Sequence, residues 1–137
     1  MARILVADDE PLVRQTMRSV LQRAGHEIFE AQDGDEALAG YRTLDPDLVL
    51  IDVIMPNREG VETIAALRKV NRRIPIVAMS GGGKTGSMLF LDLAVRMGAN
   101  CALTKPVRNA ELLQVINECL AEARVVEPEC GEAEVSS

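Results

Sequence analysis

The six residues "DLVLID" (47–52) place four consecutive apolar side chains between two aspartates. A short apolar run of this kind is typical of a strand that is buried on both faces, as in a parallel sheet covered by helices. Similar runs occur at residues 3–8, 27–31, 74–79 and 101–104, and segments with helical period separate them. Five such strands alternating with helices predict an α/β fold with one doubly wound parallel sheet.

The segments between the runs contain the usual signals for helix ends. Pro11 is tolerated in a first turn, and Gly25 is suited to stop the first helix. Asp33 and Glu36 form a capping-box-like start for a second helix that runs through Tyr41. Three more helices are predicted at residues 59–70, 87–97 and 109–123.

Length and composition indicate one small domain. The chain has 137 residues, of which 47% are hydrophobic, so it can bury a core of its own. Residues 1–123 contain all the predicted elements and form the expected folded domain. Residues 124–137 contain Pro, Gly, Ser and several Glu without a period, and they are predicted to be an acidic, flexible tail.

Charge and hydropathy exclude several classes of protein. The formal net charge is −6 and no basic residues cluster, which argues against direct nucleic-acid binding. No apolar run reaches the roughly 20 residues of a membrane span, so neither membrane insertion nor a signal peptide is expected. The three cysteines, Cys101, Cys119 and Cys130, lack metal-ligand spacing. They are interpreted as reduced thiols of a cytoplasmic protein.

Polar residues stand at the carboxyl ends of four predicted strands, where open parallel sheets bind their ligands. Each has an ordinary explanation, as a helix cap, a turn residue or a solvated charge. Their occurrence together at one edge of a sheet is much less probable as an accident. They are Asp8 and Asp9 after the first strand, Asp52 at the end of the third, Ser80 after the fourth and Lys105 after the fifth.

Neighbouring carboxylates repel one another and require a cation. Oxygen ligands with only two or three carboxylates suit Mg²⁺, or Mn²⁺, which is often completed by phosphate oxygens. Lys105 adds a charge for a phosphate oxygen, and the Ser80 hydroxyl can donate to another. Asp52, in the centre of the sheet, is then placed as a nucleophile that accepts a phosphoryl group.

A second interpretation comes from "AMSGGGKTG" (78–86), which satisfies a loose form of the P-loop of nucleotide-binding proteins through Gly83, Lys84 and Thr85. The first glycine of that motif is replaced by Ala78. A P-loop would also leave the aspartates and Lys105 unexplained. A nucleotide-binding function is therefore the weaker alternative.

Four stretches together resemble the receiver domain of two-component response regulators, over about residues 2–123: "ILVADDEP", "DLVLIDVIMPNREGVE", "PIVAMSGGG" and "GANCALTKPV". The resemblance implies the strand order 2-1-3-4-5 of a flavodoxin-like fold. It implies that Asp52 is the phosphoacceptor and that Mg²⁺ is bound by Asp8, Asp9, Asp52 and the Ile54 carbonyl. It also implies that Lys105 pairs with phosphate and that Ser80 carries the switch hydroxyl. The Lys105–Pro106 bond is implied to be cis.

The same resemblance implies a protein that binds rather than an enzyme, apart from self-catalysed phosphorylation and dephosphorylation. A sensor histidine kinase or a histidine phosphotransfer protein is the expected donor, and the target is an unnamed protein. His26, the one histidine, lacks a kinase context. No output module follows Ala123, so a stand-alone receiver is expected, with a piece of a longer regulator as the alternative. A receiver-like interaction domain that acts without phosphorylation is a further alternative.

Three features depart from the family pattern. Ala102 stands where receivers commonly have Tyr or Phe, and only Phe90 is a candidate replacement. The loop with Gly81, Gly82 and Gly83 is longer than the family pattern, and it is interpreted either as a connector or as a switch segment that orders over phosphate. The fourth helix is apolar almost all round. It is interpreted as packed on the sheet or, alternatively, as a face for a partner or a homodimer.

Overall fold

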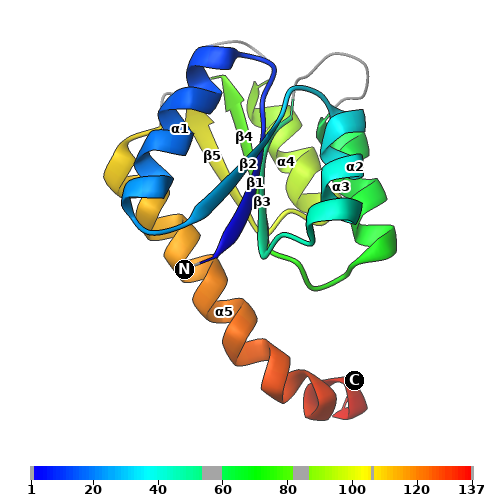
Figure 1. Cartoon of the computed structure of the whole chain (residues 1–137). Coiled ribbons are helices and arrows are strands. Elements are labelled where there is room, and N and C mark those ends of the chain that lie inside the picture. Colours follow the sequence, from blue (N-terminus) through cyan, green and yellow to red (C-terminus); the bar gives the residue numbers. More distant parts are fainter. Residues whose placement is uncertain (1, 54–59, 82–86, 106, 137) are drawn as a thin grey trace.

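The computed structural model describes residues 2–53, 60–81, 87–105 and 107–136, and the side chains of these residues except 81, 87–91 and 123–136. Within these ranges five strands alternate with five helices (Figure 1). The strands are β1 (Arg3–Ala7), β2 (Glu27–Ala31), β3 (Leu48–Asp52), β4 (Ile76–Gly81) and β5 (Cys101–Lys105). The helices are α1 (Pro11–Arg23), α2 (Gly34–Leu44), α3 (Gly60–Val70), α4 (Ser87–Met97) and α5 (Asn109–Ser136).

The sheet has the predicted order β2-β1-β3-β4-β5, and each neighbouring pair is parallel. Alternate side chains of each strand enter two separate cores. In β1, Leu5 and Ala7 belong to one core, while Ile4 and Val6 belong to the other. The first core lies between the sheet and α2, α3 and α4. The second core lies between the sheet and α1 and α5, which cover the other face (Figure 1). The fold class predicted from the sequence is therefore confirmed.

The predicted helix starts and stops are largely confirmed. Gly25 follows α1 with a φ of 96°, a backbone angle that glycine adopts without strain. The Asp33 side chain caps α2 by accepting a hydrogen bond from the Glu36 amide at 2.8 Å. That helix ends at Leu44, beyond the predicted Tyr41, because the chain turns at Asp45, whose φ is 49°.

The last helix is longer than the sequence predicted. α5 continues past Ala123 to Ser136 and projects away from the sheet (Figure 1). The prediction of a shorter helix rested on Pro128 and Gly131, because proline and glycine are the residues least favoured inside a helix. The division into a domain at 1–123 and a tail at 124–137 stays a prediction.

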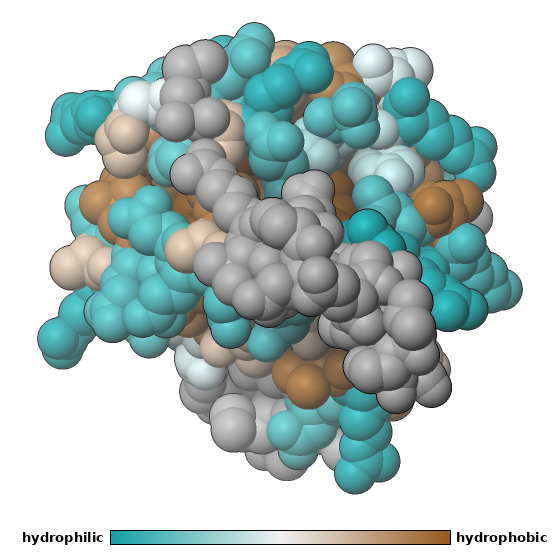
Figure 2. All heavy atoms as spheres, turned by 90° about the horizontal axis from the view of Figure 1, so that it is seen from below, coloured by the Kyte–Doolittle hydropathy of each residue, from teal (hydrophilic) through white to brown (hydrophobic). Residues whose placement is uncertain are grey.

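The surface at the end where the strands begin is mostly hydrophilic, with separate small hydrophobic areas (Figure 2). Among the described helices, none has both the length and the apolar character that crossing a membrane requires.

Candidate functional site

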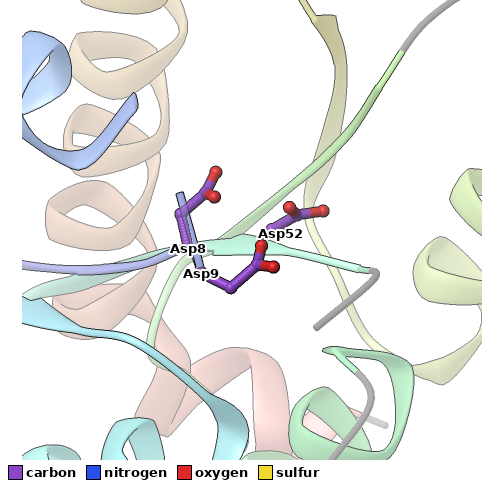
Figure 3. Close-up of side chains that lie close together, drawn as sticks. All are labelled: Asp8, Asp9 and Asp52. Atoms are coloured by element: carbon purple, nitrogen blue, oxygen red, sulfur yellow. The ribbon is translucent and has the colours of Figure 1, made fainter. Parts of the chain in front are cut away.

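Three aspartates meet at the carboxyl edge of the sheet. Asp8 and Asp9 follow β1, and Asp52 ends the neighbouring strand β3. Their carboxylates gather above the strand ends, as Figure 3 shows, with one oxygen of each within 4.8 Å of the others. Asp8 and Asp52 are buried, whereas Asp9 is exposed. The sequence prediction that these side chains lie together is therefore met.

Lys105 joins this cluster from the end of β5. Its Nζ donates to Asp8 Oδ2 at 2.5 Å and to Asp52 Oδ2 at 3.0 Å. Glu10 Oε1 lies 3.6 Å from the same nitrogen. Burial alone lowers the pKa of Lys105, but the bond to Asp8 and the charge of Asp52 outweigh it and raise that pKa above its ordinary value. The lysine is therefore a fixed positive charge among the carboxylates.

Backbone and side-chain hydrogen bonds hold Asp8 in place. Its amide donates to the Ala31 carbonyl of β2 at 3.0 Å, and its Oδ1 accepts from the Glu10 amide at 2.9 Å. Arg14, one turn into α1, donates from Nη1 to the Asp8 carbonyl oxygen at 2.6 Å. These contacts fix the direction in which the chain leaves β1, and with it the position of Asp9.

Ser80 lies at the same edge, inside β4 rather than after it. Its partner in the neighbouring strand is Thr104, next to Lys105. The side chain is fully buried, and its Oγ has no hydrogen-bond partner among the described groups. A buried hydroxyl without a partner is costly, so this oxygen is available to donate to a group that enters the site.

Gly60 is a site residue that the sequence analysis did not single out. It begins α3, and its amide donates to the Val53 carbonyl at 3.0 Å. A Cβ at this position would overlap the carbonyl oxygen of Asp52 and lie 2.4 Å from the Cα of Val53. Only glycine allows α3 to start so close to the end of β3. Gly60 lies in the stretch "DLVLIDVIMPNREGVE", but the residue pattern of that stretch does not reveal this contact.

The donor chemistry of the cluster fits a hard divalent cation. The three aspartates offer carboxylate oxygens only, which are the ligands that Mg²⁺ and Mn²⁺ prefer. They do not form a complete coordination shell, because one carboxylate oxygen of Asp8 and one of Asp52 accept hydrogen bonds from Lys105. Such a partial ligand set suits an ion that keeps waters or takes oxygens from a phosphoryl group.

Several predicted residues are outside the described part of the chain. They are Ile54, Gly82, Gly83, Lys84, Thr85, Gly86 and Pro106. Gly81 is described as the last residue of β4, and Ala102 is exposed on β5. The side chain of Phe90, the candidate replacement for the missing aromatic, is also outside that part.

The alternative P-loop interpretation finds no support at its first position. Ala78, which would open the loop, is a fully buried residue in the middle of β4. His26 lies before β2, at the edge of the sheet opposite the aspartates, and its Nδ1 accepts from the Ala2 amide at 3.1 Å. The histidine is thus a structural residue at some distance from the site.

A groove of about 470 Å³ borders the site between α1 and α5. Glu10 and Lys105 line its end nearest the aspartates, and the rest of its lining is mostly apolar, with Thr16 and Asn109 as the polar residues. Leu12, at its mouth, is 76% exposed.

The described part of α4 exposes most of its apolar side chains. Leu93, Val95 and Met97 are exposed, and of residues 92–97 only Ala94 is buried. The expectation that most side chains of this helix pack on the sheet is therefore wrong for this segment. The alternative, exposed apolar side chains, describes it better, because among the described side chains of α4, those of residues 92–97, only Ala94 joins the core beneath the helix.

Comparison with known proteins gives a consistent result. The family model described as response regulator receiver domain matches residues 4–117. The protein PilH of Pseudomonas aeruginosa is 33% identical over 123 residues, which cover 88% of this chain and 99% of PilH. The chemotaxis protein CheY of Thermotoga maritima is 28% identical over 117 residues, covering 85% of this chain and 95% of CheY.

Solved structures agree with these sequences. The crystal structure of a CheY-like receiver domain protein from Methanospirillum hungatei has a TM-score of 0.82 and 27% identity, covering 90% of this chain and 97% of that one. NtrX from Brucella abortus has a TM-score of 0.87 and 29% identity. The match covers 96% of this chain but only 29% of the NtrX chain, so NtrX is a much longer protein.

Proposed function

Because the chain belongs to the response regulator receiver domain family, we propose that Asp52 accepts a phosphoryl group from a sensor histidine kinase or a histidine phosphotransfer protein. The observation that supports this most is the meeting of Asp8, Asp9 and Asp52 with Lys105 at one edge of the sheet. The matching residues 4–117 include all four. Signalling then proceeds through protein binding that depends on phosphorylation.

In the proposed step, an Asp52 carboxylate oxygen forms a bond to phosphorus while the bond from phosphorus to the donor imidazole nitrogen breaks. The electron pair of the broken bond stays on the donor histidine. Lys105, already 3.0 Å from Asp52 Oδ2, is placed to pair with a phosphoryl oxygen. Ser80 has a buried hydroxyl free to donate to another. Positioning and charge neutralisation supply the catalysis, without a separate base.

The proposal includes Mg²⁺ or Mn²⁺ at the acidic cluster. Asp8, Asp9 and Asp52 would hold the ion, with the Ile54 carbonyl as a further ligand implied by the family. The ion supplies positive charge where phosphoryl oxygens approach the carboxylates. The protein has no separate substrate in this account, so it is not an enzyme except for its own phosphorylation and dephosphorylation.

The conformational signal is proposed to begin at the Ser80 hydroxyl. When this hydroxyl turns to the phosphoryl group, the end of β4 at Gly81 changes position. Gly82 and Gly83, the other predicted switch residues, lie outside the described part of the chain. Ala102 is exposed on the neighbouring strand and has only a methyl group, so it cannot act as the aromatic partner of this switch. The signal therefore passes through the loop and α4.

The exposed side chains of Leu93 and Met97, which are neighbours one turn apart on α4, are the proposed contact for a partner or for a second copy of the chain. Phosphorylation-dependent dimerisation is expected to raise the mass measured by light scattering when Mg²⁺ and a beryllofluoride phosphate mimic are added. A monomer at high concentration under both conditions would remove the support for a homodimer.

Phosphorylation by a small acyl phosphate tests the proposed function. We expect the intact protein to gain the mass of one phosphoryl group only when Mg²⁺ or Mn²⁺ is present. Asp52→Asn should gain none, and Ser80→Ala should still be phosphorylated but keep the resting conformation. Phosphorylation of Asp52→Asn to the wild-type extent would contradict the assignment of Asp52.

The two alternatives are less favoured. A nucleotide site using Gly83, Lys84 and Thr85 predicts measurable ATP binding by titration, which the receiver account does not. An interaction domain independent of phosphorylation predicts no phosphoryl gain in the wild-type protein. The same pair of measurements therefore separates all three functions.

A further inference from the structure

Two cysteines lie side by side at the end of the molecule away from the aspartates. Cys101 begins β5, and Cys119 lies in α5, 18 residues further along the chain. Their Sγ atoms are 3.3 Å apart. Lys105 occupies the other end of the same strand, so this contact is separate from the acidic site.

The surrounding core holds both sulfurs in this position. Cys119 belongs to the stripe of α5 that packs on the sheet with Leu112, Ile116 and Leu120. Cys101 packs against the same core. A disulfide needs an S–S distance of about 2.0 Å, so the two sulfurs would have to approach by roughly 1.3 Å.

We propose that Cys101 and Cys119 form a thiol–disulfide site that hydroperoxides oxidise, and that the resulting bond clamps α5 to β5. This inference goes beyond the phosphoryl-transfer function and does not depend on it. The contact was not expected from the sequence, where the cysteines lack a recognisable spacing.

The two thiols differ in environment, which assigns their order of reaction. Cys101 is half-buried and Cys119 is only 3% exposed, so peroxide reaches Cys101 first. Burial and the hydrogen bond with Cys101 raise the pKa of Cys119 to about 12, so Cys119 is a protonated thiol at neutral pH. Cys101 is thus the sulfur that reacts with the peroxide, and Cys119 is the one that resolves the resulting sulfenic acid.

Hydrogen peroxide oxidises the pair in two steps. The Cys101 sulfur bonds to one peroxide oxygen while the O–O bond breaks. The other oxygen takes the Cys101 thiol proton and leaves as water, which gives a sulfenic acid. The Cys119 sulfur then bonds to the Cys101 sulfur while the S–O bond breaks. The departing hydroxide takes the Cys119 proton and leaves as water. Both sulfurs are oxidised, and the peroxide is reduced to water.

The expected bond closes a loop that contains Lys105 and the start of α5. Restricting this loop in the unfolded chain should raise Tm by roughly 5 °C, and a thiol reductant should reverse the rise. Amide exchange in residues 109–122 should also slow, because the bond holds α5 on the sheet.

Peptide mapping by mass spectrometry under non-reducing conditions tests the site in the full chain treated with hydrogen peroxide. We expect a Cys101–Cys119 linked peptide from the monomer, which Cys101→Ser abolishes. Cys130→Ser is the matched control, because it removes the third cysteine and should leave the link intact. Oxidation that yields only sulfinic acid, or only links through Cys130, would overturn the site. A Tm that stays unchanged in the linked protein would overturn the clamp.

Discussion

A missing side chain at Gly60 decides how closely α3 approaches the end of β3, where Asp52 lies. The helix begins directly beside the backbone of Asp52 and Val53, where no Cβ has room. Asp8 and Ser80 are constrained in another way, since both are polar and fully buried. At this scale the site consists of residues that are unfavourable for stability alone, as expected for a functional constellation.

Replacing Gly60 by alanine should destabilise the domain by about 2 kcal/mol or more, since the added Cβ overlaps backbone atoms that have little freedom to move. Urea unfolding measures this change. Gly40→Ala in α2 is the matched control: its Cβ would meet the side chains of Leu5, at 3.4 Å, and Leu44, at 3.7 Å, and should alter stability by less than about 1 kcal/mol. Equal stabilities for the two variants would refute the close approach at Gly60.

Among the elements, α1 is held against β2 by a group of charges. Glu30 of β2 accepts hydrogen bonds from Arg14 Nε at 3.0 Å and from Arg18 Nη1 at 2.7 Å. The bond from Arg18 is the main cause that lowers the pKa of Glu30 below its ordinary value of 4.5; burial opposes it, and Arg14 adds to it. Arg14 also reaches the Asp8 carbonyl, so these charges link the packing of α1 to the site.

The lowered pKa of Glu30 gives stability a definite pH dependence. The contribution of ionised Glu30 to the free energy of unfolding is fully present above pH 4.5, the ordinary pKa of this carboxyl group. It is lost as the pH falls through the lower pKa that Glu30 has in the folded protein. Glu30→Gln should therefore cost about 1 kcal/mol at neutral pH. Urea unfolding of both proteins from pH 7 downwards should show this difference shrinking below 4.5. A difference that is constant with pH would exclude the charge as its cause.

Much of the element arrangement could be predicted from the sequence. The apolar run at 47–52 and its four counterparts identified the strands, and capping residues such as Asp33 identified helix starts. The meeting of Asp8, Asp52 and Lys105 was also expected, because parallel strands bring their carboxyl ends to one edge. Their roles stay predictions.

Other features depend on contacts between distant segments, which a local pattern does not contain. Three examples are the hydrogen bond from Arg14 to Asp8, the lack of space for a Cβ at Gly60, and the contact between the sulfurs of Cys101 and Cys119. The exposure of α4 was also misjudged. Its apolar composition suggested burial, whereas burial depends on how much of the helix the sheet covers.

For the whole molecule, the arrangement separates two ends. The carboxyl edge of the sheet holds the acidic site, and the opposite edge holds His26, the start of β5 and the outgoing part of α5 (Figure 1). Leu112, Ile116 and Leu120 are the buried leucine and isoleucine residues that α5 contributes to the core, and all precede Ala123.

Deleting residues 124–137 tests whether the receiver domain ends at about residue 123, as proposed. We expect the shortened protein to keep its Tm within about 2 °C, because the removed segment follows the last of these core residues, Leu120. Thermal unfolding followed by circular dichroism measures the change. A fall of more than about 5 °C would assign the segment a structural role that the proposed domain boundary denies.

The site of phosphorylation is the central claim, and reductive mapping measures it most directly. Borohydride reduces an aspartyl phosphate to homoserine, and this change marks the residue that held the phosphoryl group. After treatment with a small acyl phosphate and Mg²⁺, we predict homoserine at position 52 and unchanged aspartates at positions 8 and 9. Homoserine at either of those positions, or at none, would contradict the account.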